Sequence, residues 1–439
     1  MIAPRLVLEQ LFSAAVRGAD PYAATFAAID GRTLGARLWI LASGKGAVPM
    51  ARASLDAVAA SHRTVLGGVV VTTDNVPAVG PLPVFTGDHP VPGAGSLIAS
   101  QALSRVVRLV QPGDEVVVLL SGGSTSLMAA PIEGVSADAM CALFRGLHRS
   151  GAPIDEMNAM RKRVLRWGAG RLAVALAGSR VTCLIASDVL GDDPAAIASG
   201  PCAGDAWTAA GLIELAQRRR LWPHIPDEVR RCLDRTLMGD VPETPKPGAA
   251  AFALVEQRII LGNRDALAAI AREGATLGVS IRLAPAPVAG RARSTGASIA
   301  HAAVAAREAA AQRALTTPCG LALVWGGETT VPLGAGTTGV GGRAQELALA
   351  AAQVLHEYGA RGRGITILAA GTDGRDGPTD AAGAIVDGAS WSRIALAGRD
   401  PVHDLDSHSA YPAHRAAGTL LRTGPTGTNV NDVVIALVD

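Results

Sequence analysis

A lysine in a glycine-rich turn is the first group of this sequence with an evident chemical use. Lys45 stands in ASGKGA at 42–47, between an apolar run and a stretch with helical spacing. Its ammonium group could join backbone amides in holding a phosphate or a carboxylate. A solvated lysine is the alternative, but cations are disfavoured at the positive end of a helix, so we favour the functional interpretation. The turn is not a Walker A loop, because G-x-x-x-x-G-K-[ST] occurs nowhere in the chain.

A second glycine-rich turn, SGGSTSL at 121–127, follows another apolar run. It contains Ser121, Gly122, Gly123 and Ser124 in succession. Glycines let backbone amides approach an anion closely, and the hydroxyl groups add donors. An ordinary tight turn between a strand and a helix accounts for the same residues equally well.

Carboxylates gather in a third turn, SDVLGDDPAAIASGP at 187–201. Asp188, Asp192 and Asp193 lie within six positions after an expected strand. Mg²⁺ favours such a place, since it takes one or two carboxylates together with waters and substrate phosphates. Asp193 could be a helix cap only. Asp188, directly after the strand, is the stronger functional candidate.

Polar and cationic side chains also meet in MNAMRKRV at 157–164. Asn158, Arg161 and Lys162 would lie on adjacent helical turns. Arg161 could grip a carboxylate with two hydrogen bonds. A basic cluster on a solvated surface explains this spacing equally well.

The C-terminal half contains a further glycine-dense segment, WGGETTVPLGAGTTGVGGRAQEL at 325–347. Glu328 ends an expected strand, and Arg343 begins a long helix. We interpret the segment as an anion-binding loop whose arginine can reach a transferring phosphoryl group. The glycines at 334–339 satisfy G-x-G-x-x-G, but Pro332 interrupts the preceding element, whereas a dinucleotide fingerprint runs directly from strand to helix.

Two more polar segments follow. GTDGRDGPTD at 371–380 sets Asp373, Asp376 and Asp380 among glycines, where they could bind a cation or a nucleotide ribose, although the spacing of a calcium loop is missing. TGPTGTNVND at 423–432 includes Asn429 and precedes the last apolar run. Asn and Asp as ordinary turn residues are the alternative there.

Short runs rich in Val and Ile, separated by Ala-rich stretches with helical spacing, must position these turns. Such runs predict parallel strands covered by helices on both faces, hence an α/β fold. In these sheets ligands gather at the carboxyl ends of the strands. The expected strands are 38–42, 69–72, 115–120, 181–186, 258–261, 280–283, 321–325, 365–370 and 433–437. The expected helices, besides an amphipathic first helix, are 46–60, 94–110, 136–150, 168–177, 206–220, 263–277, 295–314 and 343–358.

The length of 439 residues, with 49% apolar and 18% charged residues, indicates a folded protein of two domains. Five prolines within 222–251 favour a connection there, so we expect domains at 1–240 and 241–439. The 40 Lys and Arg against 38 Asp and Glu form no dense basic run, which argues against nucleic acid as a partner. The five widely spaced cysteines predict reduced thiols in the cytoplasm, and the apolar runs are too short to span a membrane.

Seven segments taken in order resemble the glycerate 2-kinase family, the class II or MOFRL-type glycerate kinases. They are GDHPVP, LLSGGSTSL, SDVLGDDPAAIASGP, GGETTV, GGRAQELAL, GTDGRDGPTDAAGA and TGPTGTNVND, and the resemblance as a whole runs from about Ser43 to Asn431. The resemblance implies a Rossmann-like N-terminal domain with a parallel sheet and a second, mixed α/β domain, with the active site in the cleft between them. It also implies transfer of the γ-phosphoryl group of ATP, with Mg²⁺, to the 2-hydroxyl of D-glycerate.

The resemblance assigns roles residue by residue. It implies that Lys45 and Arg343 are catalytic and that Asp188 orients the hydroxyl group or holds the metal. From these motifs and turns, the expected substrate-binding residues are Arg161, Asn158, Ser121 and Ser124. The expected nucleotide- or phosphate-binding residues are Gly122, Gly123, Glu328, Gly341, Gly342, Asp373 and Asn429, and the expected metal ligands are Asp188 and Asp192.

The chain departs from the family pattern at Arg163, Leu165, Gly168 and Ala344, so the acceptor is expected to be glycerate or a closely related hydroxy or sugar acid. Two alternatives stay open at this point. One is an NAD(P)H-dependent hydroxypyruvate reductase, because family members have sometimes been given that name. The other is a sugar-acid-binding homologue without activity. The expected partners are the small acid and ATP, and a homodimer is one candidate assembly.

Overall fold

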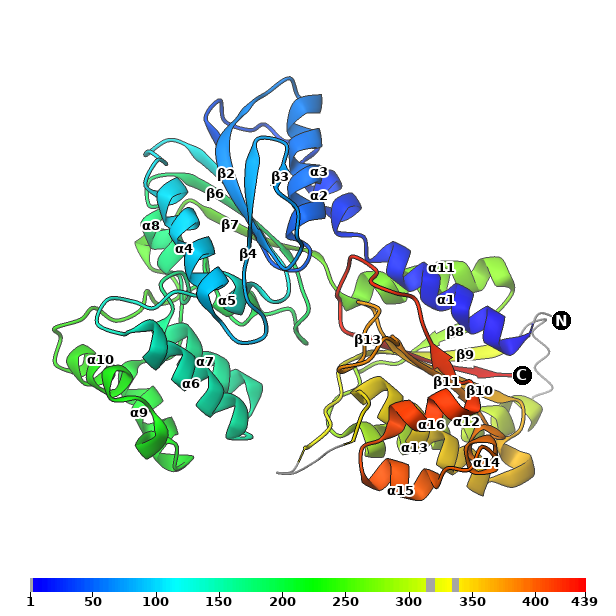
Figure 1. Cartoon of the computed structure of the whole chain (residues 1–439). Helices are drawn as coiled ribbons and strands as arrows, with labels where there is room; N and C mark the ends of the chain where they lie inside the picture. The colour runs from blue at the N-terminus through cyan, green and yellow to red at the C-terminus, as the bar shows by residue number, and fades with distance from the viewer. Residues whose placement is uncertain (1–2, 313–319, 334–338) are drawn as a thin grey trace. The chain divides into compact units, whose positions relative to one another are not determined.

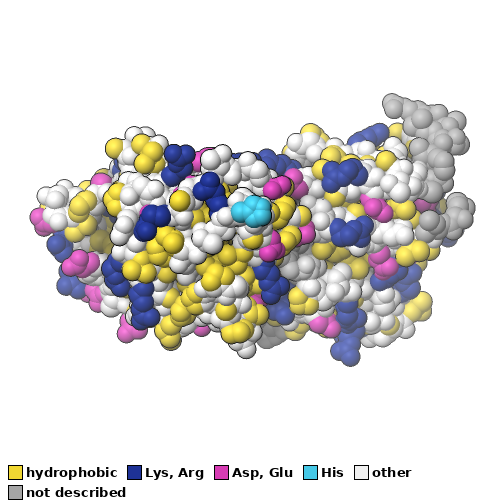
Figure 2. Space-filling view, turned by 90° about the horizontal axis from the view of Figure 1, so that it is seen from above, with side chains coloured by type: hydrophobic (Ala, Val, Ile, Leu, Met, Phe, Trp, Pro, Cys, Tyr) yellow, Lys and Arg dark blue, Asp and Glu magenta, His cyan; other side chains and the backbone are white. Residues whose placement is uncertain are grey.

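The computed structural model describes residues 3–312, 320–333 and 339–439. The chain divides into two compact units. The parallel-sheet unit is Pro21–Ile260, and the mixed-sheet unit combines Met1–Asp20 with Leu261–Asp439. Among the described residues, no helix combines the length and the apolar character needed to cross a bilayer. On the face drawn in Figure 2, the described Lys and Arg side chains are scattered among Asp and Glu.

The parallel-sheet unit is built on a seven-stranded sheet with the order β3-β4-β2-β1-β5-β6-β7. β1 pairs in parallel with β2 and β5, β2 with β4, and β5 with β6, whereas β3 and β4 are antiparallel. The strands are β1 (Leu38–Ser43), β2 (Val65–Thr72), β3 (Ala78–Val79), β4 (Leu82–Thr86), β5 (Glu115–Leu120), β6 (Arg180–Ala186) and β7 (Val255–Leu261).

Helices cover both faces of this sheet (Figure 1). Leu41 and Val71 pack with α4 residues such as Leu103, while the alternate residues Ile40 and Val70 are buried on the other face, where α3 contacts β1 and β2. Helices α6, α7, α9 and α10 share a separate apolar core. The helices are α2 (Pro21–Ile29), α3 (Ala47–Ala60), α4 (Ala94–Val107), α5 (Ser124–Leu127), α6 (Ala137–Arg149), α7 (Ile154–Val164), α8 (Arg171–Ala175), α9 (Ala209–Arg218) and α10 (Asp227–Leu237).

The mixed-sheet unit contains a six-stranded sheet with the order β12-β11-β10-β13-β9-β8. Its neighbouring strands are antiparallel except for β8 and β9. The apolar runs by themselves predicted parallel strands here, whereas the structure has the mixed second domain that the resemblance implied. Alternating strands and helices predict where strands lie but not how each connection returns to the sheet. The strands are β8 (Ser280–Leu283), β9 (Leu321–Gly327), β10 (Ile365–Gly371), β11 (Gly383–Asp387), β12 (Leu420–Leu421) and β13 (Asp432–Val438).

Two layers of helices enclose this second sheet (Figure 1). Helices α1 and α11 lie on one side, and α12 and α13 pack together on the other. Gly296 permits their close approach, because a Cβ atom there would lie 2.1 Å from the carbonyl oxygen of Leu347. The helices are α1 (Pro4–Gly18), α11 (Asn263–Leu277), α12 (Ala292–Gln312), α13 (Arg343–Glu357), α14 (Ser390–Leu396), α15 (Pro401–Asp406) and α16 (Ala410–Ala417).

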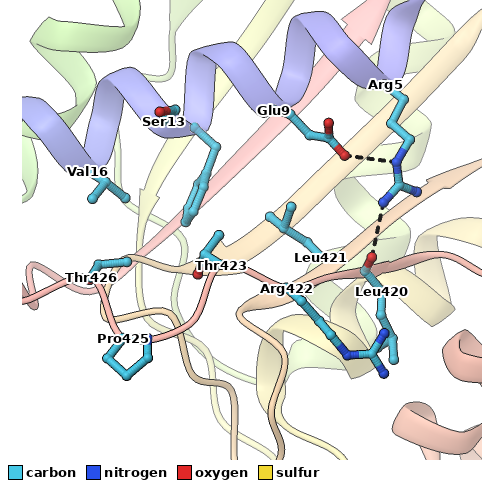
Figure 3. A pocket seen from close by; sticks show the side chains of 11 residues that line it. Arg5, Glu9, Ser13, Val16, Leu420, Leu421, Arg422, Thr423, Pro425 and Thr426 are labelled. Atoms are coloured by element: carbon cyan, nitrogen blue, oxygen red, sulfur yellow. Dashed lines mark hydrogen bonds and ion pairs between the residues drawn. The ribbon is translucent and has the colours of Figure 1, made fainter.

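Helix α1 belongs to the mixed-sheet unit because its side chains bind the C-terminal part of the chain. Arg5 pairs with Glu9 at 2.9 Å and donates a hydrogen bond to the carbonyl oxygen of Leu420 at 3.0 Å (Figure 3). A cavity of about 560 Å³ lies between α1 and the segment 420–426. Arg422 also lines this cavity, and its guanidinium pairs with Asp380.

The division of the chain differs from the boundary expected near residue 240. The proline-rich segment lies inside the parallel-sheet unit, where Glu243 pairs with Arg163 and Thr244 donates to Asp205. β7 then completes the first sheet. Prolines there shape a segment within one unit, so proline content alone was a poor marker of the division. The expected α/β fold with a parallel sheet and a second, mixed domain is confirmed.

Candidate functional site

Two turns at the carboxyl edge of the first sheet brace each other around Lys45. β1 and β5 are parallel neighbours, and Ser43 is paired with Leu120 at their ends. The amide of Lys45 donates to the carbonyl oxygen of Gly122 at 2.9 Å, and the amide of Gly46 donates to the Ser121 hydroxyl at 2.9 Å. The turn that carries Lys45 is therefore held rigidly against the turn at 121–124.

The hydroxyl groups expected to bind substrate have structural partners in this arrangement. Ser124 donates to the carbonyl oxygen of Ser43 at 2.7 Å, and both Ser121 and Ser124 are buried. Gly44, with a φ of +124°, lies where a Cβ atom would come within 2.1 Å of the Ser121 hydroxyl oxygen. The two serines thus join the turns, and a direct role in substrate binding stays a prediction.

Lys45 itself is half-buried and acts on a neighbouring histidine. Partial burial and the positive charge of Lys45 both lower the pKa of His89. The His89 ring lies beside the turn at 121–124, because a Cβ atom at Gly123 would be only 3.2 Å from this ring. The His89 imidazole beside Lys45 is therefore neutral at neutral pH.

Asp188 follows β6, the strand next to β5, so the sheet brings it to the same edge. Asp188 and Asp192 are both half-buried. Thr125 and Ser199 share a hydrogen bond of 3.0 Å, which ties the turn at 121–127 to the loop after β6. Among the described residues, no group of three or more His, Cys, Asp or Glu side chains is arranged to hold a metal ion.

Arg161 on α7 is the expected carboxylate-binding residue. Its guanidinium carbon lies 5.2 Å from the centre of the Phe144 ring, and burial lowers its pKa. The buried Nε atom of Arg161 has no hydrogen-bond partner among the residues that the structure describes. A half-buried guanidinium with an unused donor suits an incoming anion. Asn158 lies on the same helix and is half-buried.

The two residues after Arg161 belong to a buried ionic cluster rather than to a solvated surface. Lys162 pairs with the fully buried Asp205 at 2.8 Å. Arg163, one of the departures from the family pattern, forms two hydrogen bonds of 2.9 and 3.0 Å with Glu243. The surface-cluster interpretation therefore fails for Lys162, and Arg163 fastens α7 to the proline-rich segment.

In the mixed-sheet unit, three side chains, those of Asp432, Glu328 and Asn431, form a ring around Arg343. Asp432 accepts hydrogen bonds from Nε and Nη2 of Arg343 at 2.6 and 2.9 Å. Glu328 pairs with Nη1 of the same guanidinium. Asn431 donates from Nδ2 to the second carboxylate oxygen of Glu328 at 3.0 Å. Burial alone would lower the pKa of Arg343, but Asp432 and then Glu328 outweigh it and raise this pKa.

Sheet register explains how residues far apart in the sequence meet in this ring. β13 is antiparallel to both β9 and β10, so its first residue, Asp432, is paired with Gly327 and with Gly371 at the ends of those strands. Asn263 at the start of α11 donates to the carbonyl oxygen of Asp432 at 3.1 Å. Gly326 is required beside it, because a Cβ atom there would overlap the Asn263 side chain.

Asp376 occupies the N-terminus of α13, where the sequence suggested an anion-binding loop. Its carboxylate accepts hydrogen bonds from the amides of Ala344 and Gln345 at 3.1 and 2.8 Å. Burial and the charge of Asp432 raise the pKa of Asp376 to about 7, although the two amide bonds oppose this shift. These two amides are therefore engaged by the protein itself.

The remaining expected residues lie close to the ring. Asp373 accepts a hydrogen bond from the amide of Arg375 at 3.0 Å, and the Asn429 side chain accepts one from the amide of Asn431 at 3.4 Å. Gly341 and Gly342 precede α13 and are half-buried. The glycine segment at 334–338 and Cys319 lie outside the described residues.

The sequence interpretation missed Asp432, Asn431 and Asp376 as members of one constellation. The segments DGRDG and NVND were recognised as polar, but Asp432 is the first residue of its strand, whereas ligand-binding residues were expected after strands. The available signal in the sequence was an acid at the start of the last strand. This acid reaches the site only because its strand pairs antiparallel with its neighbours, and the sequence pattern alone did not indicate that pairing.

Comparison with known proteins decides the family. A domain of unknown function, DUF4147, matches residues 7–234, and the MOFRL family matches residues 321–432. A glycerate 2-kinase of Pyrococcus horikoshii is 34% identical, over 98% of this chain and 96% of its own length. The chain belongs to the glycerate 2-kinase family.

Solved structures agree with this membership. The crystal structure of a glycerate kinase from Thermotoga maritima has a TM-score of 0.83 and 32% identity, covering 99% of both chains. A Pyrococcus horikoshii structure has a TM-score of 0.78 and 34% identity over 100% of this chain and 99% of that one. A protein of Agrobacterium vitis, 37% identical over 100% of this chain and 95% of its own length, is named "Putative hydroxypyruvate reductase". The resemblance seen in the motifs is confirmed, and it covers the whole chain.

Proposed function

We propose that this protein transfers the γ-phosphoryl group of ATP to the 2-hydroxyl group of D-glycerate, giving 2-phosphoglycerate and ADP. The observation that carries the proposal is the match to glycerate 2-kinases over nearly the full length of the chain. The half-buried cation on a braced turn and the arginine at the start of α13 supply the charges that such a reaction needs.

Phosphoryl transfer depends on alignment and on neutralising the charge of the phosphoryl oxygens. Lys45 and Arg343 are the two cations that neutralise this charge. Asp188 takes one of two roles: it holds the metal ion, or it accepts a hydrogen bond from the 2-hydroxyl group of the acceptor, directs an oxygen lone pair to the γ-phosphorus and takes up the proton as the new bond forms. Arg161 binds the carboxylate of the acceptor, which fits its unused Nε donor.

The proposed donor is ATP with Mg²⁺, which supplies further neutralisation of the phosphate oxygens. The donor set fits this ion, because Mg²⁺ needs only one or two protein carboxylates beside waters and phosphates. Asp188 and Asp192 are the carboxylates proposed for it. Both are half-buried on the same loop, so each keeps a face toward solvent.

Steady-state kinetics with purified protein test the two cations. ADP formation from ATP and D-glycerate is expected to fall by about 100-fold or more in Lys45→Ala and in Arg343→Ala, as for loss of a donor to a developing anion. Arg52→Ala is the matched control, because Arg52 is an exposed cation on the helix that follows Lys45. Its kcat/KM should change by no more than about twofold, as for other surface substitutions. Variants within a few-fold of the parent would remove both residues from the mechanism.

The reductase alternative has a specific motivation in the names of two relatives from Agrobacterium vitis. The described chain argues against it, since β9 ends at Gly327 and α13 begins only at Arg343, so no direct strand-to-helix turn exists there for a dinucleotide. Nicotinamide absorbance in the presence of hydroxypyruvate, without ATP, separates the two reactions. Steady oxidation of NADH or NADPH would favour the reductase.

The identity of the acceptor is the most specific part of the proposed function. Glycerate and related hydroxy and sugar acids should be compared for ADP release, because the departures at Arg163 and Ala344 set this chain apart from the family pattern. Arg163 is buried in an ion pair and Ala344 is buried in α13. Neither side chain therefore faces an open surface, and we expect D-glycerate to remain the best acceptor of the panel.

A further inference from the structure

One of the segments that resemble the family, GDHPVP at 87–92, has no part in the proposed reaction. It follows β4, which runs parallel to β2, as β2 does to β1, so the segment lies at the same edge of the sheet as the turn that carries Lys45. His89 in this segment is exposed, and its ring lies beside Gly123. An accessible imidazole at this edge is a candidate for contact with a ligand.

Hydrogen bonds on both sides of His89 hold its backbone in place. The Ser126 hydroxyl group on α5 donates to the carbonyl oxygen of Pro90 at 2.6 Å. On the other side, the amide of Asp88 donates to the Ser96 hydroxyl oxygen at 2.9 Å, and the Asp88 carboxylate accepts a hydrogen bond from the amide of Ser96 at 3.1 Å. The position of the imidazole is therefore fixed by α4 and α5.

The same segment also contacts the helix pair that carries Arg161. The Cys141 thiol on α6 donates to the carbonyl oxygen of Pro92 at 3.3 Å. Phe144 lies three residues further along α6, and the Arg161 guanidinium of α7 lies over its ring at 5.2 Å. The segment 87–92 therefore joins the turn at 121–127 to the helices around the residue proposed to bind the acceptor carboxylate.

The His89 ring has hydrogen-bonding groups that the protein does not use. Neither ring nitrogen bonds to another of the residues that the structure describes. Partial burial and the charge of Lys45 lower the pKa of this ring, so it is neutral at neutral pH. A neutral imidazole offers one N–H donor and one acceptor nitrogen. This pair matches a hydroxyl group, which also donates and accepts, better than an ionised carboxylate or phosphate, which only accepts.

The acceptor of the proposed reaction has one polar group that still lacks a partner. Arg161 binds its carboxylate and the 2-hydroxyl group receives the phosphoryl group, which leaves the 3-hydroxyl group. We propose that His89 binds the 3-hydroxyl group of D-glycerate and so makes the site prefer 2,3-dihydroxy acids to 2-hydroxy acids that lack this group. The inference rests on the proposed function and names a specificity-determining residue for it.

A comparison of two acids tests this role, because D-lactate differs from D-glycerate only in lacking the 3-hydroxyl group. In the parent protein, kcat/KM for ADP release should be about five- to tenfold higher with D-glycerate, as for one hydrogen bond between uncharged groups. His89→Ala should lower the value for D-glycerate by the same factor and leave the value for D-lactate within about twofold. An equal loss with both acids would show a structural role of His89 and would overturn the proposal.

Two further variants serve as controls. His148 is an exposed histidine on α6, and His148→Ala should leave the preference for D-glycerate unchanged. His89→Gln retains one donor and one acceptor in its amide group and should keep most of the preference. Circular dichroism of all variants should match that of the parent, since both histidines are exposed.

Failure of this inference is distinguishable from failure of the proposed function. Titration calorimetry of D-glycerate and D-lactate without ATP measures the same preference in the absence of turnover. If the parent releases no ADP with any acid of the panel, the proposed function fails, while calorimetry of the parent and of His89→Ala still decides on the role of His89. If the parent is active and His89→Ala keeps the full preference, the role of His89 is wrong and the kinase function stands.

Discussion

Gly342 lies directly against the carboxyl group of Asp376. A Cβ atom at position 342 would come within 2.2 Å of the Asp376 carboxyl carbon, closer than any real packing contact. The second glycine of the GGR segment is therefore explained by a close approach, and not by an unusual backbone, since its φ is −140°. Asp376 in turn binds the first amides of α13, the helix that begins with Arg343.

Replacement of this glycine should disturb α13 and the site together. We expect Gly342→Ala to lower the free energy of unfolding by about 1–3 kcal/mol, because the added methyl group must displace a buried carboxylate or the helix end. Urea unfolding followed by circular dichroism measures the change. Phosphoryl transfer should fall as well, because Arg343 is the next residue in the chain.

A second glycine gives the matched control for that experiment. Gly146 lies inside α6, and a Cβ atom there would meet no neighbouring atom within 4 Å. Gly146→Ala should raise stability by about 0.5–1 kcal/mol, as alanine does in a helix interior. Equal effects of the two substitutions would mean that Gly342 is not packed against Asp376.

Asp376 should make stability depend on pH in a direction unusual for a carboxylate. Its pKa is raised to about 7 by burial and by Asp432, so the folded protein favours its protonated form. The contribution of Asp376 to the free energy of unfolding is complete below its unfolded pKa of 3.8 and is lost as the pH rises to about 7. Asp376→Asn does not titrate, so the stability of the parent relative to this variant should decrease from pH 4.5 to pH 7 and then level off.

His414 provides the opposite slope in the same pH range. Complete burial lowers its pKa to about 4, and its ring nitrogens bond to the Gln345 carbonyl and the Thr419 hydroxyl, which suits the neutral form. Its contribution is present above 6.5 and is lost as the pH falls toward 4. Relative to His414→Gln, the parent should therefore lose stability on acidification. If the stability difference between parent and variant changed with pH in the same direction for Asp376→Asn and His414→Gln, one of these two groups would not be buried.

The pair of Arg163 and Glu243 should matter more than an exposed pair in the same unit. The Arg163 side chain is only 2% exposed and donates to Glu243 and Thr244, so Arg163→Met should cost about 1–3 kcal/mol for the lost hydrogen bonds, although Lys246 still pairs with Glu243. Arg32 and Glu256 form an exposed pair, and Arg32→Met should cost less than about 1 kcal/mol. Thermal unfolding of both variants measures the difference. Similar losses would mean that Arg163 is not a structural anchor.

Much of the fold followed from local patterns in the sequence. The runs at 115–120 and 280–283 were predicted at the bounds of β5 and β8, and helix 263–277 at the bounds of α11. Short or irregular elements such as β3, β12 and α14 carry too few apolar residues for a periodic signal, and they were missed. The expected edge with Lys45 and Asp188 formed because parallel strands bring consecutive turns to one side of a sheet.

The sequence by itself determined most of the strands, the glycine-rich turns and the two cations, Lys45 and Arg343, because these depend on residue type over short spans. Only the tertiary structure decided that Glu328 and Asp432 share one guanidinium. About a hundred residues separate these acids in the chain. Antiparallel pairing places the end of β9 beside the start of β13, and this register, set by packing of the whole sheet, is not encoded in any short segment.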